Sequence, residues 1–206
     1  MRKLSFIIIL ALMLCLSMQA FAVSLENGQS LSGGVCQANG DDESAVEVSG
    51  TAQAELIGVT VQKTGGKASS TDSASFCGLN AAVRVYDSAV LMISGCQIEA
   101  SASNATGVFA YDRGTIYIEN SSVNVTGGGA GGVQVAGGGT LIGQNLTVTS
   151  ASKAAIRSDR GGGTMELAGG TYISTGSNGC PRHIQYSGYY GKERELHIRG
   201  FPRGNH

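Results

Sequence analysis

The sequence repeats itself about every 25 residues, and this period limits the possible folds more than any other feature. Segments aligned on Val83, Val108, Val133 and Ile156 follow one another at spacings of 25, 25 and 23 residues. Each repeat holds three short stretches of alternating apolar and polar residues, separated by Gly, Asn, Ser and Asp. Alternation predicts strands with one buried face, and the intervening residues favour turns. Three strands per repeat, stacked coil on coil, predict an all-β parallel β-helix.

The repeat also predicts which side chains point inward. Three further sets keep the register of the first: Leu91, Ile116, Leu141 and Met165; Ile93, Ile118, Gly143 and Leu167; and Ile98, Val123, Leu146 and Tyr172. Residues 55–66 match the later repeats and supply an earlier half-turn, and a longer loop at about 64–78 separates it from the first full repeat. We therefore expect four to five coils, with no amphipathic helix, between residues 54 and 180.

The N-terminal residues predict export. Arg2 and Lys3 precede the apolar run from Leu4 to Ser17, and Ala20-Phe21-Ala22 fits the small-x-small cleavage rule. Residues 1–22 are thus expected to be a cleaved signal peptide, and no later apolar run predicts a membrane span. Residues 23–53 contain an acidic turn and one short alternating strand, which predicts an N-terminal cap or half-coil.

Residues 181–206 differ in character from the repeats. They hold all three histidines, both prolines and five Lys or Arg residues against two Glu. Three interpretations stay open: an atypical basic tail, an irregular or truncated last coil, and a frameshifted end. The frameshift hypothesis rests on a permissive back-translation of residues 183–200, in which one dropped base gives another alternating strand and an Asn-rich turn.

Charge and composition exclude several classes of function. Without residues 1–22 the chain keeps 12 Lys and Arg residues against 15 Asp and Glu, a net charge of −3, which is no footprint for nucleic acid. Because residues 23–180 contain no His, the coils cannot hold a Ser-His-Asp triad. No catalytic constellation, cofactor or dedicated metal centre is predicted. Of the cysteines left in an oxidising compartment, Cys77 is able to pair with Cys36 or Cys96, and Cys36–Cys77 is the favoured disulfide.

Four residues form the candidate surface site. In the repeat register Tyr86 stacks on Tyr111, and Asp87 stacks on Asp112 at the start of a turn. Two carboxylates about 5 Å apart are able to bind Ca²⁺, and the tyrosines are able to contact sugar rings. The simpler alternative is that Asp opens the turn, and it is favoured because Gly137 and Arg160 occupy the next two rungs. The aromatic residues of these two coils are Tyr86, Phe109, Tyr111 and Tyr117. They are able to form a platform for sugars, but stacking that stabilises neighbouring rungs is the favoured interpretation.

The strings "GTIYIENSSVNVTGGG", "GTLIGQNLTVTSAS" and "GTMELAGGTYISTGSNG" resemble coils of secreted right-handed β-helix proteins. The resemblance is to the adhesin-like, autotransporter-passenger-like type within the pectin-lyase-like superfamily, and it covers about 54–180. It implies a bacterial, secreted or cell-surface protein with a structural or adhesive role, and a truncated passenger domain is one form that such a protein takes. Host or environmental glycans or surface proteins are then the expected partners. The same superfamily includes polysaccharide lyases and non-catalytic carbohydrate-binding β-helices, which are the alternatives.

Overall fold

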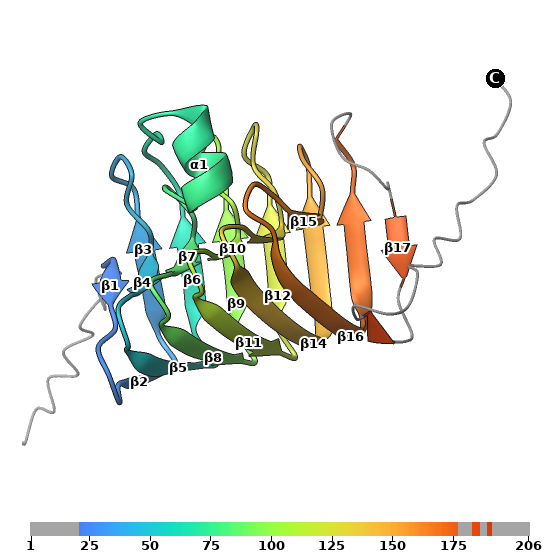
Figure 1. Cartoon of the computed structure of the whole chain (residues 1–206). Helices are drawn as coiled ribbons and strands as arrows, with labels where there is room; N and C mark the ends of the chain where they lie inside the picture. Colours follow the sequence, from blue (N-terminus) through green and yellow to red (C-terminus); the bar gives the residue numbers. More distant parts are fainter. Residues whose placement is uncertain (1–20, 177–182, 186–188, 191–206) are drawn as a thin grey trace, which may run out of the picture.

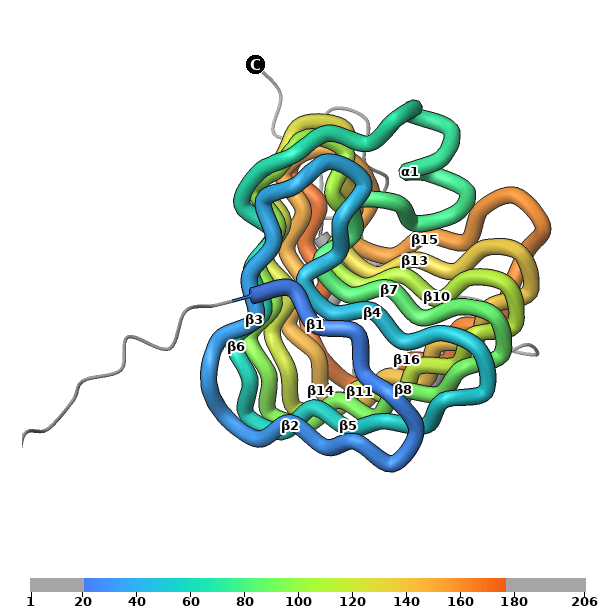
Figure 2. Tube along the Cα trace, turned by 90° about the vertical axis from the view of Figure 1, so that its left-hand side faces the viewer, coloured from blue at the N-terminus to red at the C-terminus, as the bar shows by residue number. Residues whose placement is uncertain are grey.

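The computed structural model describes residues 21–176, 183–185 and 189–190, and it is a parallel β-helix (Figure 1). Its strands form three faces, named here faces 1, 2 and 3 after the first, second and third strand of each coil (Figure 2). Face 1 consists of β1 (Val23–Ser24), β4 (Val46–Val48), β7 (Val83–Val85), β10 (Val108–Ala110), β13 (Val133–Val135) and β15 (Ile156–Ser158).

Faces 2 and 3 belong to one sheet that turns a corner. Face 2 consists of β2 (Ser30–Ser32), β5 (Gln53–Ile57), β8 (Val90–Ser94), β11 (Thr115–Glu119) and the first halves of β14 (Gly139–Ser150) and β16 (Gly163–Ser174). Face 3 consists of β3 (Val35–Ala38), β6 (Thr60–Lys63), β9 (Gln97–Ala100), β12 (Ser122–Val125) and the second halves of β14 and β16. Two short strands, β17 (His183–Gln185) and β18 (Tyr189–Tyr190), pair antiparallel with β16.

The predicted fold is confirmed, but the number of coils is larger than expected. The strands make six coils instead of four to five, because residues 23–38 already supply all three strands of the first coil. These residues had been predicted to form only a cap or half-coil. The predicted signal peptide lies outside the described residues except for its last two residues. Most of the basic segment 181–206 also lies outside them, so the frameshift hypothesis stays a prediction.

The predicted register is also confirmed, with one correction. Val83, Val108, Val133 and Ile156 are direct neighbours across face 1, and Leu91 and Ile93 begin the two expected ladders of face 2. On face 3, however, Val148 and not Leu146 follows Val123 and precedes Tyr172. Leu146 instead belongs to a separate buried ladder at the corner between faces 2 and 3, formed by Val59, Cys96, Ser121 and Leu146. The error was a slip of two residues, which keeps a side chain on the same face of a strand.

A left-handed residue directly before each member of the corner ladder turns the chain from face 2 to face 3. Its φ in successive coils is 61° at Gly58, 63° at Gly95, 48° at Asn120 and 54° at Asn145. Gly and Asn are the residues that adopt this left-handed backbone at the least cost. The Asn145 amide also donates to the Asn120 side-chain oxygen at 2.9 Å, which ties two neighbouring coils together.

A short helix covers part of the outside of the solenoid. The segment expected to be only a loop contains α1 (Thr71–Cys77), which lies against the outer side of face 1 (Figures 1 and 2). The Ser70 hydroxyl accepts from the Ser73 backbone N–H at 2.9 Å and begins the helix, and Gly78, with φ 70°, ends it. Across the residues described, no helix has the length and apolar character needed to cross a membrane.

Candidate functional site

The outer side of face 1 carries the densest set of charged and aromatic side chains. One outward ladder runs Glu47, Arg84, Phe109, Gln134 and Arg157. The last four of these directly follow the predicted inward residues Val83, Val108, Val133 and Ile156, so alternation correctly predicts that they share an outward position. The covering of this ladder by α1 was not predicted. Because α1 lies over them, Phe109 and Gln134 are only 0% and 1% exposed.

The last turn of α1 is held to face 1 by polar contacts. Arg84 donates to the Cys77 backbone carbonyl at 2.8 Å, and Gln134 donates to the Ser75 carbonyl at 2.7 Å. Lys153 donates to the Ser75 hydroxyl at 3.1 Å. The final carbonyls of a helix lack partners within the helix and carry partial negative charge, so cationic and amide donors stabilise this end. Arg84 and Lys153 therefore anchor the helix.

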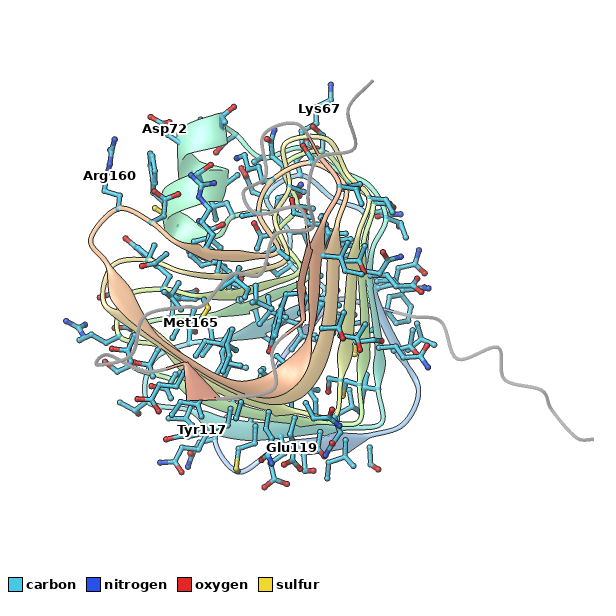
Figure 3. The ribbon with its side chains drawn as sticks, turned by 90° about the vertical axis from the view of Figure 1, so that its right-hand side faces the viewer. Lys67, Asp72, Tyr117, Glu119, Arg160 and Met165 are labelled. Atoms are coloured by element: carbon cyan, nitrogen blue, oxygen red, sulfur yellow. The ribbon has the colours of Figure 1, made fainter. Side chains whose placement is uncertain are left out.

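The predicted aromatic platform does not form. The Phe109 ring is packed against Gly78 beneath α1 and is shielded from solvent. Tyr117 lies on a different face of the solenoid, on β11 in face 2, where it points outward (Figure 3). The four aromatic residues cannot act as one surface, because Phe109 is buried and Tyr117 lies on another face. The alternation along each strand was predicted correctly, but the sequence did not show where the chain turns from face 1 to face 2.

The predicted site at Tyr86, Asp87, Tyr111 and Asp112 is brought together as expected, at the turn between faces 1 and 2. The Tyr86 hydroxyl donates to Glu47 at 2.8 Å, and the Arg84 guanidinium lies over its ring at 4.0 Å from the centroid. Burial raises the pKa of Tyr86, and the hydrogen bond to Glu47 adds to this effect. Tyr86 is thus engaged with neighbours from its own face.

The two aspartates sit at turn positions with left-handed backbone. Their φ values are 55° at Asp87 and 42° at Asp112, and the next coil places Gly137 there with φ 56°. The rung therefore favours residues that tolerate this conformation. Arg113 lies between the carboxylates, with contacts of 3.8 Å to Asp87 and 3.3 Å to Asp112. A sugar or calcium site here stays a prediction, and a cation would have to compete with Arg113.

No group of three or more His, Cys, Asp or Glu side chains in the described part of the chain is arranged to hold a metal ion. The acidic loop 41–43 is used for local structure. Asp41 accepts from the Lys67 N–H at 2.8 Å and Asp42 from the Ser69 N–H at 2.6 Å, which fastens the segment that leads into α1.

The predicted Cys36–Cys77 disulfide is not formed, and Cys96 is also a free thiol. Cys36 points into the solenoid from β3, where its neighbour across the strands is Val61, whereas Cys77 lies outside face 1 at the end of α1. Burial raises the pKa values of the Cys36 and Cys96 thiols. Cys77 instead makes a side-chain hydrogen bond with Tyr111, and this bond raises the pKa of Tyr111.

Face 2 contains a groove that the sequence reasoning missed. Its volume is about 450 Å³, and it crosses β5, β8, β11 and β14 on the outer side of the sheet. The lining residues are Glu55, Leu56, Ile57, Met92, Ile93, Ser94, Tyr117, Ile118, Glu119, Ile142 and Gln144. Figure 3 shows Tyr117 and Glu119 projecting away from the solenoid, on the side opposite to the interior in which Met165 lies.

The groove is built from two outward ladders that run along the solenoid axis. One ladder is Glu55, Met92, Tyr117 and Ile142, and the other is Ile57, Ser94, Glu119 and Gln144. Three of its apolar side chains are unusually open, with exposures of 46% for Ile57, 44% for Met92 and 45% for Tyr117. Outward positions of a strand that faces solvent are normally polar. Met92, Tyr117 and Ile142 occupy the same outward position in three successive repeats, and this apolar run was the sequence signal that could have revealed the groove.

Comparison with known proteins assigns no function to either face, so faces 1 and 2 are interpreted from their own side chains. No protein-family model, no curated protein and no solved structure matches this chain.

Proposed function

We propose that this protein is a secreted or cell-surface β-helix that binds partner molecules through the groove of face 2, in an adhesive and non-catalytic role. The observation that carries the proposal is the contiguous exposure of Ile57, Met92 and Tyr117 on a rigid sheet. Scattered single apolar residues are ordinary on protein surfaces, but a contiguous patch marks an interaction site. Because each coil is fixed by its neighbours, the groove keeps its shape without a ligand, which lowers the entropic cost of binding.

The state of face 1 supports a non-catalytic role. Its outward basic residues, Arg84 and Arg157, are engaged with the α1 carbonyl of Cys77 and with the carboxylate of Asp159. A polysaccharide lyase would need such a base free beside its substrate, together with acidic groups that neutralise the uronate charge.

Carbohydrate binding without catalysis is the second candidate, and one observation favours it. The half-exposed ring of Tyr117 is bordered by polar groups of Ser94, Glu119 and Gln144. An open aromatic ring beside hydrogen-bonding groups is suited to the apolar face and the hydroxyls of a sugar.

The test is a binding experiment with the chain from residue 23 to residue 206. The fluorescently labelled protein is applied to a panel of immobilised glycans and extracellular matrix proteins, beside the variant Ile57→Ser/Met92→Ser/Tyr117→Ser. Val35→Ser is the matched control, because Val35 is an exposed apolar residue, 37% open, on face 3. We expect retention of wild type and control on at least one surface, and at least a tenfold loss for the triple variant. Equal retention of all three proteins, or retention of none, would disprove the proposal.

A further inference from the structure

The charge of the face 2 groove narrows the kind of partner it fits. Two of its lining residues are glutamates, and none is Lys, Arg or His. The Glu119 carboxylate accepts a hydrogen bond from the Ser94 hydroxyl at 3.0 Å. No hydrogen bond or ion pair satisfies the Glu55 carboxylate within the part of the chain that the structure describes. The groove therefore presents negative charge without a compensating cation of its own.

The apolar side chains of the groove also discriminate between partners. Three of its four outward apolar residues, Ile57, Met92 and Ile142, are aliphatic or thioether groups, and only Tyr117 is aromatic. Sugars bind on flat aromatic rings, whereas branched and flexible aliphatic surfaces pack best against other apolar side chains. Methionine in particular adapts its shape to varied apolar partners. This composition favours a peptide over a glycan.

The spacing of the two carboxylates fits an extended chain. Glu55 and Glu119 are two coils apart and occupy neighbouring outward positions along their strands. With about 4.8 Å between strands and about 6.6 Å between side chains on one face of a strand, their separation is about 12 Å. Cationic residues four positions apart in an extended peptide are about 13 Å apart and lie on one side of it. Apolar residues of the same peptide then meet Met92 and Tyr117 between the two carboxylates.

We propose that the groove binds a cationic, amphipathic peptide segment of a partner protein, with Lys or Arg at Glu55 and Glu119 and apolar side chains at Met92, Tyr117 and Ile142. This inference rests on the proposed binding function of the same groove and names the chemistry of its ligand. Burial of the apolar side chains supplies most of the affinity, since exposed ion pairs contribute little and are screened by salt.

The experiment is fluorescence anisotropy of three short labelled peptides with the chain from residue 23 to residue 206. The first, the Lys/Leu peptide, repeats Lys-Ser-Leu-Ser, so that Lys and Leu lie on the same side of the extended chain. The second, the Lys/Ser peptide, has Ser in place of Leu, and the third, the Glu/Leu peptide, has Glu in place of Lys. The protein variants are Met92→Ser/Tyr117→Ser for the apolar contacts and Glu55→Gln/Glu119→Gln for the charges. Glu99→Gln serves as a matched control, because Glu99 is an exposed carboxylate on face 3.

We expect wild type and Glu99→Gln to bind the Lys/Leu peptide alike and to bind it at least about tenfold more tightly than either other peptide. The apolar double variant should weaken this binding by at least about tenfold and the charge double variant by about threefold or more, and added salt should weaken it without abolishing it. Equal binding of the Lys/Ser peptide would overturn the inference, because only the net charge would then be recognised. If no peptide binds but the surface panel still shows groove-dependent retention on glycans, the ligand class is wrong while the binding function stands. If neither assay responds to the groove variants, both proposals fail.

Discussion

Replacement of Phe109 by Ala tests whether the helix really converts an outward side chain into a core residue. Phe109 points away from the solenoid interior, yet it is 0% exposed, because Gly78 at the end of α1 lies directly on its ring. A Cβ atom built at Gly78 would lie 2.6 Å from the ring, so the contact is close. Ala81 and Ala136 complete this small cluster, and Tyr111 packs against it.

The expected cost follows from the burial. Truncation of a fully buried Phe to Ala removes its transfer free energy and leaves a cavity, at a cost of about 3–5 kcal/mol. Tyr117→Ala is the matched control, because Tyr117 is also an outward aromatic residue of the fourth coil but is 45% exposed. Its truncation should cost less than about 1 kcal/mol. If Phe109 were open to solvent, as alternation alone implies, both substitutions would have the same small effect.

Urea denaturation followed by circular dichroism measures the difference. With an m-value of about 2 kcal/mol/M, a loss of about 3 kcal/mol lowers the midpoint by about 1.5 M. Limited proteolysis supplies a second measurement, because release of α1 should expose the segment from residue 64 to residue 80 to cleavage. An unchanged midpoint together with unchanged cleavage of this segment in Phe109→Ala would refute the reasoning.

Three further predictions concern side chains away from the groove. Burial lowers the pKa of Lys63, so the unfolded chain binds more protons than the folded one at alkaline pH. The unfolding free energy of wild type should therefore rise relative to that of Lys63→Met as the pH approaches about 10.4, the ordinary lysine pKa, and parallel pH profiles in urea titrations would contradict this. Calcium should raise the melting temperature of Arg113→Gln but not that of wild type, since the guanidinium competes for the two turn carboxylates; an equal response of both proteins in differential scanning calorimetry would count against competition. In a Cys180→Ser background, a chromogenic thiol reagent should modify Cys77 rapidly, and it should modify the buried Cys36 and Cys96 only on unfolding. If no thiol reacts rapidly, the Cys36–Cys77 disulfide hypothesis is restored.

Much of the fold could be predicted because stacking makes each coil repeat its neighbour's pattern. The inward residues keep phase from Val83 to Ile156, and alternation identifies the buried face of each strand without knowledge of the turns. The first coil was missed because its strands, at two to four residues, are too short to show alternation clearly. The Leu146 error arose because a corner ladder and a strand ladder lie two residues apart and are both apolar.

The helix could not be predicted from periodicity. Its sequence TDSASFC covers only two turns and buries small residues, Ala74 and Ser75, so no apolar stripe appears at a spacing of 3.6 residues. The local signals were Ser70 as N-cap, Asp72 in the first turn and Gly78 as C-cap. Because α1 contacts face 1 several coils away in the sequence, the burial of Phe109 and Gln134 depends on tertiary packing that the repeat pattern does not contain.

Faces 1 and 2 differ in a way that explains why the sequence pointed to a site on face 1 and not to the groove on face 2. Face 1 holds the arginines, tyrosines and carboxylates that resemble catalytic groups, but these residues bind α1 and one another. Face 2 holds the less reactive Ile57 and Met92, and no described element covers them. Placing polar side chains at these outward strand positions would avoid exposing apolar surface to water and would leave the inward packing unchanged. Contacts between these side chains across the strands stabilise the stacking of the coils, but they do not require an open apolar surface. We propose that the binding of a partner to the groove accounts for this exposure.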